Sequence, residues 1–244
     1  MDWYPLYNSV RIASVSTVIV YFLGIFLANV VARAPRVVKG VLDVVLTLPL
    51  VLPPTVVGYL LLRVFGPRRT VGAWLLNTFG IKLTMVWCAA ILATVVVSFP
   101  LMYRTARGAF ESFDENLADA ARTLGRSERW IFWRVKMPYC QQGIVAGAVL
   151  AFARALGEYG ATAMICGYTP GSTATVSTTV YQLWRTNDDA GAFAWVMVNL
   201  GISAVVLLAM NWFEQKGKSG AGAGAKPGAK PAAKPGRVRL GGAR

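Results

Sequence analysis

Arg154 and Glu158 are the residues of this sequence best suited to handle charge inside an otherwise apolar stretch. They lie four positions apart, so in a helix they share one face and can form an ion pair. Charges within a hydrophobic span are costly, and they face a protein interior or water. The pair therefore either lines a path through the protein or anchors its helix. Because Glu158 would repel an anion unless Arg154 compensates for it, we favour the anchoring role over direct contact with an anion.

Prolines at 49, 53 and 54 mark a second place of interest. Each proline removes a backbone donor and clashes with the preceding turn, so a helix is expected to bend or break there. Backbone groups freed inside a membrane must be satisfied by protein or by a water-lined cavity. Pro53 and Pro54 therefore indicate either a kinked helix beside a transport path or a structural kink, and these two readings are about even on the residues alone.

Hydroxyl side chains crowd the segment 167–192. Uncharged donors suit a tetrahedral oxyanion that must be released again, since tight charge pairing would trap it. The alternative is a polar loop that faces a partner protein, and both can hold. The hydroxyl residues are Thr169, Ser172, Thr173, Thr175, Ser177, Thr178 and Thr179.

Composition places these residues in a membrane protein. The chain is 55% hydrophobic and only 15% charged, which is too apolar for an ordinary soluble domain. Apolar runs long enough to cross a bilayer recur along it. We expect five spans, at 10–32, 41–65, 84–105, 142–166 and 193–213. The first is too long for the apolar core of a signal peptide and is expected to be retained.

The distribution of charge predicts an orientation. The net charge is +14. Lys and Arg gather after the first span, after the third span and in the segment 215–244, with 18 on that side against five on the other. The positive-inside rule then puts the N-terminus outside and the C-terminus in the cytoplasm.

Several kinds of chemistry have no support in the sequence. There is no His, and Cys88, Cys140 and Cys166 have no metal or redox spacing. Gly217-Lys218-Ser219 imitates the end of a phosphate-binding loop. However, Trp212 occupies the position where that loop requires a Gly, and no strand is expected before it. We therefore expect no metal site, no cofactor and no nucleotide site in this chain, so ATP-driven work would need a separate ATPase.

Between the third and fourth spans lies a charged segment, 119–138. Ser112 and Glu115 fit a capping box, and an apolar stripe at helical spacing follows, formed by Leu117, Ala120, Ala121 and Leu124. Gly125 is placed for a left-handed C-cap, Ser127 for a second N-cap and Pro138 for the first turn of the next span. The pattern predicts a short helix, a tight turn and another short helix, either as a docking element or as an ordinary surface helix.

This segment resembles the signature loop of bacterial ABC importer permeases. Asp119-Ala120-Ala121, then Gly125, then nine residues, then Val135-Lys136-Met137-Pro138 match that loop in spacing. Asp119, Val135 and Met137 replace the usual Glu, Ile and Leu. The resemblance implies a type I ABC importer permease fold, all-α, with about five transmembrane helices and a cytoplasmic coupling-helix loop. It also implies coupling to an ATPase subunit through Asp119, Ala120, Ala121, Leu124, Gly125 and Pro138.

Two further stretches are similar to molybdate importer permeases. They are the proline run ending in Pro53-Pro54-Thr55 and the order Gly157 to Thr162, Pro170-Gly171, then Ser177 to Tyr181. The resemblance covers roughly 8–213, the permease domain. It implies a homodimer that works in membrane lipid with two ATPases and an extracytoplasmic molybdate-binding protein. The candidate path residues are Pro53, Pro54, Arg154, Glu158, Thr162 and Thr178.

Three alternatives to the molybdate interpretation stay open. Tungstate is nearly isosteric with molybdate, and sulfate or thiosulfate permeases share the fold. A single-component channel or secondary transporter would need no partner, but it leaves the spacing at 119–138 unexplained.

The segment 215–244 is rich in Gly, Ala, Pro and Lys and is expected to be disordered and cytoplasmic. Weak tethering of this tail to anionic lipid or RNA is the functional alternative to a solvated tail. We favour the solvated tail and expect no nucleic-acid partner.

Overall fold

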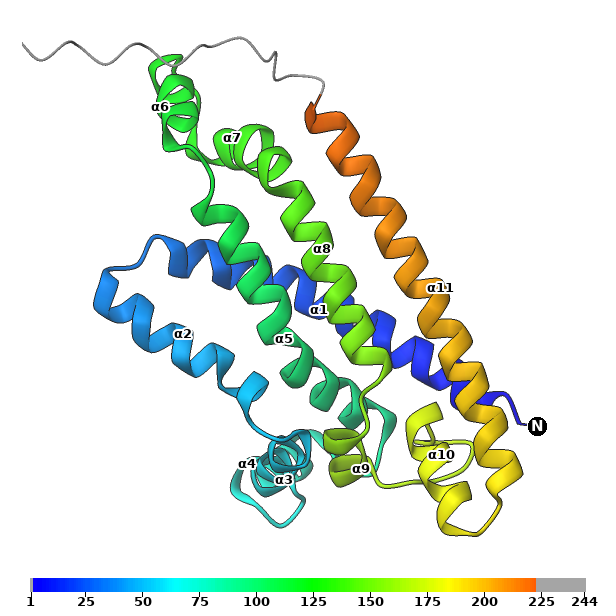
Figure 1. Ribbon diagram of the computed structural model, residues 1–244. Coiled ribbons are helices and arrows are strands. Elements are labelled where there is room, and N and C mark those ends of the chain that lie inside the picture. The colour runs from blue at the N-terminus through cyan, green and yellow to red at the C-terminus, as the bar shows by residue number, and fades with distance from the viewer. Residues whose placement is uncertain (1, 223–244) are drawn as a thin grey trace, which may run out of the picture.

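Two long helices, α1 (Tyr4–Ala32) and α5 (Trp87–Glu111), form the centre of the computed structural model, which describes residues 2–222. Helix α8 (Met137–Leu156) packs beside α5, and α11 (Asp189–Gly222) lies along the outside of this group (Figure 1). The described residues are helical throughout, with no strand among them. This agrees with the all-α membrane fold expected from the sequence.

Small residues let these helices approach closely, as is usual where helices pack within a membrane. A Cβ placed on Gly24 of α1 would lie 2.7 Å from the Met102 side chain of α5. One on Gly143 of α8 would lie 2.7 Å from the Ala109 Cβ. Met102 and Tyr103 are fully buried at this centre. Helix α5 is therefore clamped between α1 and α8 along much of its length.

Within residues 2–222, three helices are long and apolar enough to cross a membrane, and the number reaches five when each of two bent pairs counts as one span. The three are α1, α5 and α11, which correspond to the expected spans 10–32, 84–105 and 193–213. Helices α2 (Arg36–Val51) and α3 (Pro54–Phe65) form one bent pair, with an angle of 111°. The other pair is the helix Glu128–Leu156 with α9 (Gly160–Cys166), bent by 55°.

The first break lies where the prolines predicted it, since Pro53 is the N-cap of α3 and Pro54 begins that helix. The second break was not predicted from the sequence. The span expected at 142–166 stops at Leu156 and resumes at Gly160. The segment 157–159 is therefore irregular backbone between two helices.

Two further helices fill segments that sequence reasoning left without a helix. They are α4 (Thr70–Phe79) and α10 (Val176–Arg185), and α10 occupies the middle of the segment interpreted as a polar loop. Helix α11 continues past the expected domain end at 213 to Gly222. The rest of the expected tail, 223–244, lies outside the described residues.

Candidate functional site

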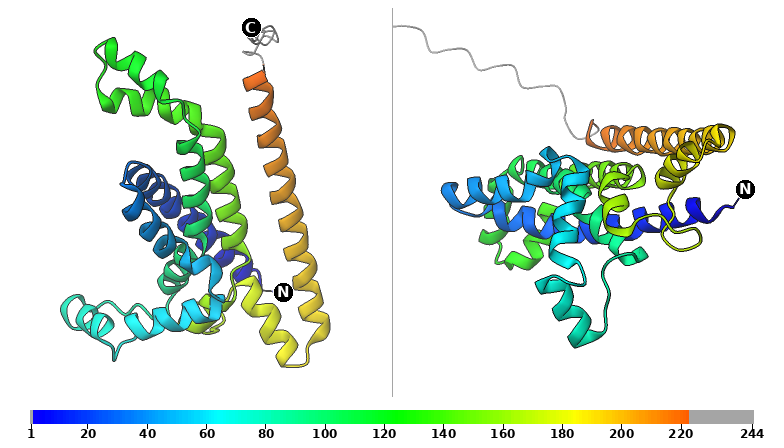
Figure 2. Two further views of the ribbon diagram at one scale, coloured as in Figure 1. Left: turned by 60° about the vertical axis from the view of Figure 1, so that its left-hand side comes forward. Right: turned by 90° about the horizontal axis from the view of Figure 1, so that it is seen from below.

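The segment 112–138 forms a helical hairpin at one end of the molecule, beyond the end of α5 (Figures 1 and 2). Its helices are α6 (Glu115–Thr123) and α7 (Glu128–Ile131), and the π-helix η1 (Phe132–Lys136) joins α7 to α8. Pro138 lies in the first turn of α8, as predicted. Along the chain, α6 is thus joined to α5 by residues 112–114, and α7 is joined to α8 by continuous helical backbone.

The N-cap of α6 differs from the prediction. Asp114 is the cap, and its carboxylate accepts a hydrogen bond from the Asn116 backbone N–H at 3.0 Å. Ser112 instead ends α5, where its hydroxyl donates to the Ala109 carbonyl at 2.9 Å. The capping box predicted for Ser112 and Glu115 is therefore wrong. Helix α5 runs further than expected, and Asp is as good an N-cap as Ser.

The turn between α6 and α7 was predicted correctly. Gly125 has φ +72°, a left-handed conformation that glycine adopts without cost. The Arg126 N–H then donates to the Ala121 carbonyl at 3.1 Å and closes the end of α6. Ser127 is the N-cap of α7, where its hydroxyl accepts from the Trp130 N–H at 3.4 Å. The two short helices are therefore fixed in one relative orientation.

The apolar stripe of α6 is divided between the protein and solvent. Ala121, together with Ala118, is buried. Leu117, Ala120 and Leu124 are exposed, and Leu124 is 79% exposed. This free apolar surface on a capped hairpin is what a docking element presents to a partner.

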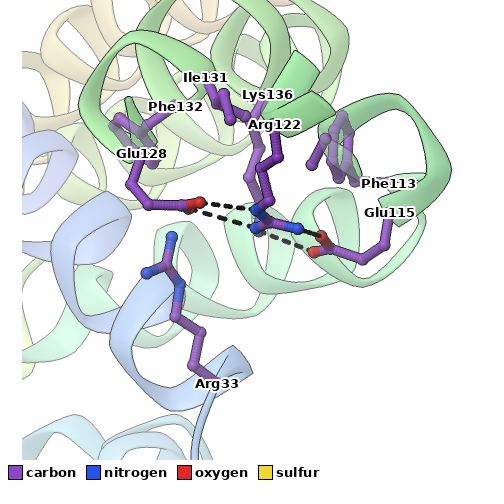
Figure 3. A pocket seen from close by; sticks show the side chains of 9 residues that line it. Arg33, Phe113, Glu115, Arg122, Glu128, Ile131, Phe132 and Lys136 are labelled. Carbon is purple, nitrogen blue, oxygen red and sulfur yellow. Dashed lines mark hydrogen bonds and ion pairs between the residues drawn. The ribbon is translucent and has the colours of Figure 1, made fainter. Parts of the chain in front are cut away.

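One arginine holds the hairpin together. The Arg122 guanidinium lies 2.5 Å from the Asp119 carboxylate. It also lies 2.6 Å from the Glu128 carboxylate (Figure 3), so it bridges α6 and α7. Glu115 is a looser neighbour, at 4.0 Å. The hydrogen bond from Arg122 lowers the pKa of Glu128 below its ordinary value. Hydrogen bonds to Glu128 and Asp119 raise the pKa of Arg122. Asp119, predicted to couple, is thus already engaged by Arg122.

Lys136 is a functional candidate that sequence reasoning passed over. It is only 7% exposed, and its ammonium lies 5.3 and 5.5 Å from the ring centres of Phe110 and Phe113. Its distance to the Glu115 carboxylate is 3.8 Å. Lys136, Arg122 and Arg33 line a cavity of about 220 Å³ behind the hairpin (Figure 3). The signal in the sequence was a lysine at a motif position otherwise open to any residue.

All the candidate path residues except Thr178 lie at or beside the two breaks, which touch one another. A Cβ on Gly160 would lie 3.0 Å from the Pro54 Cβ, and one on Gly58 would lie 2.7 Å from the Ala161 Cα. Thr162, on α9, is 2% exposed. Pro53, Pro54 and Thr162 therefore belong to one crossing of α3 with α9, far along the chain from the hairpin.

Arg154 and Glu158 form the expected ion pair at 2.8 Å, but Glu158 lies beyond the end of α8. Its other carboxylate oxygen accepts from the Ala161 N–H at 2.7 Å, at the start of α9. Arg154 thus belongs to one side of the break, and Glu158 links it to the other. The ion pair and the hydrogen bond join the two sides of the break, and the anchoring role stays a prediction.

Thr178 lies apart from this group. It forms a capping box with Thr175 at the start of α10, where the two hydroxyls are 3.0 Å apart. Within residues 2–222 it shares no hydrogen bond with the α3–α9 crossing. Helix α10 reaches the break by another side chain, because the rings of Tyr181 and Tyr159 lie 5.4 Å apart.

The chain is similar to known proteins over most of its length. It is 39% identical over 222 residues to the molybdenum transport system permease protein ModB of Escherichia coli K12, which covers 91% of this chain and 97% of that one. It is 36% identical over 203 residues to the putative molybdenum transport system permease protein YvgM of Bacillus subtilis 168, which covers 83% and 89%. A crystal structure of a bacterial ABC transporter for alginate import superposes with a TM-score of 0.72 at 17% identity, covering 87% of this chain and 78% of that one.

That structural similarity shows the fold of a type I ABC importer permease. The model of the family described as binding-protein-dependent transport system inner membrane component matches residues 21–218, from α1 to α11. The matched region contains the hairpin and both broken spans. The chain belongs to this family of multi-pass membrane permeases.

Proposed function

We propose that this chain is the permease subunit of an ATP-driven molybdate importer. The observation that carries the proposal is the similarity to molybdenum permeases, which extends over 91% of the chain. The geometry agrees with it. A rigid hairpin offers an apolar face at one end, and two broken spans meet elsewhere in the membrane part.

The hairpin is the docking site for a separate ATPase subunit. Leu117, Ala120 and Leu124 supply the contact surface, and Gly125 sets the angle between its helices. Asp119 acts through Arg122 rather than as a free charge. Pro138 lies in the first turn of the helix that carries any movement of the hairpin into the membrane.

The mechanism is alternating access. ATP closes a pair of ATPase subunits, the hairpins of two copies of this chain move together, and the path opens outward to accept molybdate from an extracytoplasmic binding protein. Hydrolysis returns the path to the inward state. Pro53, Pro54, Arg154, Glu158, Thr162 and Thr178 are the path candidates. The chain itself needs no cofactor, since ATP is used by the partner.

The orientation follows from the positive charges. The N-terminus lies outside and the C-terminus in the cytoplasm, which places the hairpin where an ATPase can reach it. The assembly sits in the cell membrane as a homodimer of this chain.

Uptake by the purified assembly tests the proposal. The chain is reconstituted with its ATPase and binding protein in liposomes, and ATP-dependent uptake of labelled molybdate is measured against tungstate and sulfate. Saturable uptake of molybdate that requires ATP supports the proposal. Preference for tungstate or sulfate would show that the proposed substrate is wrong. Uptake by the chain alone would favour a channel or secondary transporter.

A further inference from the structure

Four charged residues form a ladder between α2 and α5 that neither the motif nor the path accounts for. Lys39 pairs with Glu111, and Asp43 pairs with Arg107. Arg107 also binds Glu111 within α5, at 3.1 Å. Positive and negative groups thus alternate from Lys39 to Glu111, Arg107 and Asp43, and the ladder carries no net charge.

The ladder ends at a buried hydroxyl. Tyr103 is fully buried, and its hydroxyl donates to the Asp43 carboxylate at 2.6 Å. The charged side chains of Asp43 and Arg107 are themselves only 22% and 21% exposed. Charges in such places are costly unless paired, so they are retained where they have a task.

The positions of the rungs show how the two helices run. Lys39 and Asp43 are one turn apart on α2, and their partners Glu111 and Arg107 are one turn apart on α5 in the opposite order. The helices are therefore antiparallel, and the ladder fixes their register. Apolar contact adds less here, because no residue of α2, a helix that the structure describes completely, is buried. Leu42 and Leu46 are only partly buried.

The ladder joins the two ends of the molecule where function is proposed. Glu111 is the last residue of α5, and α6 of the docking hairpin begins at Glu115. At its other end α2 stops at Val51, directly before the break at Pro53 that leads to the α3–α9 crossing. The hairpin, the end of α5, the ladder and α2 therefore form one continuous series of contacts.

We propose that the Lys39–Glu111 and Asp43–Arg107 pairs are the linkage that makes α2 move with α5, so that movement at the ATPase reaches the broken span. These four are positioning residues, because they act through α2 rather than by touching the transported ion. The inference rests on the proposed function and adds the route by which force leaves the hairpin.

The first test removes the ladder one charge at a time in the reconstituted assembly. Asp43→Asn and Arg107→Gln are compared with Arg104→Gln, which alters an exposed arginine of α5 that has no ion pair among the described residues. We expect ATP hydrolysis to continue while molybdate carried per ATP falls about tenfold in either ladder variant, the size of a typical coupling between side chains in contact. The double variant should lose no more than either single one. Arg104→Gln should match the unmodified chain.

The second test replaces the ionic linkage by a covalent one. Lys39→Cys and Glu111→Cys are combined in a Cys88→Ala background, since Cys88 is the exposed native cysteine. The pair should be uncoupled until a short bismaleimide joins the two positions, and joining should restore transport. If joining abolishes transport, or if the single variants transport normally, α2 does not work as a unit with α5 and the inference is wrong.

A parallel measurement separates this inference from the proposed function. The extracytoplasmic binding protein stimulates ATP hydrolysis on the other side of the membrane, so this signal must pass through the same helices whichever anion is carried. An unmodified assembly that shows stimulation but takes up no molybdate would overturn the proposed substrate. The ladder would still be judged by loss of stimulation in Asp43→Asn and in the Lys39→Cys/Glu111→Cys variant, and by its return when the latter is cross-linked. Normal stimulation in that variant would overturn the ladder alone.

Discussion

Gly58 and Ala161 lie so close that a methyl group on Gly58 would approach the Ala161 Cα to 2.7 Å. The nearest atoms include the Ala161 carbonyl oxygen at 2.8 Å, and backbone cannot turn aside as a flexible side chain can. The two broken spans therefore meet backbone to backbone at this point.

Gly58→Ala should separate α3 from α9. Overpacking a tight contact costs about 1–3 kcal/mol, so we expect a lower melting temperature in detergent and slower uptake. Gly40→Ala is the control, since a Cβ at Gly40 meets nothing within 4 Å. Equal stability of the two variants would mean that α3 and α9 do not hold this contact.

Gly125 offers a test of the turn between α6 and α7. A Cβ there meets nothing within 4 Å, so its φ of +72° is the constraint. Gly125→Val should weaken binding of the ATPase while the membrane part still inserts, because a branched residue strongly resists this conformation. Gly125→Asn should bind nearly normally, since Asn tolerates it. Co-purification of the ATPase measures both, and unimpaired assembly of the Val variant would contradict a docking role for the turn.

The Arg122–Glu128 bridge predicts how the hairpin responds to acid. The pKa of Glu128 is lowered from 4.5 by the hydrogen bond from Arg122. A carboxyl with a lower pKa in the folded state stabilises it above the unfolded pKa, and this contribution is lost as the pH falls through the folded pKa. The protection of the α7 amides, measured relative to their intrinsic exchange rate at each pH, should therefore be unchanged from pH 8 to about pH 5 and fall only below it. In Arg122→Gln the acid-dependent step should disappear, whereas Arg129→Gln should retain it.

Glu158 serves both sides of the second break, and two substitutions separate its roles. Glu158→Gln keeps an acceptor for the Ala161 N–H but removes the charge facing Arg154. Glu158→Ala removes both and should cost more than Glu158→Gln, by about 1 kcal/mol, the scale of a hydrogen bond between neutral groups. Thermal unfolding of the assembled membrane part measures the difference. Equal melting of the two variants would show that the bond to Ala161 contributes little.

Local signals in the sequence predicted much of the hairpin and the first break. Gly125, Ser127 and Pro138 each have a backbone role that depends on close neighbours, and each lies as expected. Ser112 was assigned wrongly because two good capping residues stand close together, and only the length of α5 decides between them.

Contacts between distant segments could not be predicted in the same way. The break after Leu156 depends on Gly160 fitting against Pro54, and the pairing of Asp43 with Arg107 depends on how two helices are aligned. Asp43 in an apolar span was a usable signal, since such a charge calls for a partner. That partner, Arg107, lies 64 positions away in the sequence. Only the packing of the two helices determines which residue it is.

The π-helical turn at Phe132–Lys136 gives the spacing of the hairpin segment a geometric meaning. A wide turn holds an additional residue without interrupting the helical path, and one residue of α-helix corresponds to about 100° of rotation. Deleting a single residue there would leave a continuous helix but turn α7 about the axis of α8, so that Leu117 and Leu124 would face another direction. The nine residues between Gly125 and Val135 thus set the rotation of the hairpin about the axis of α8. Hairpins exchanged between permeases would have to preserve that angle as well as their contact surface.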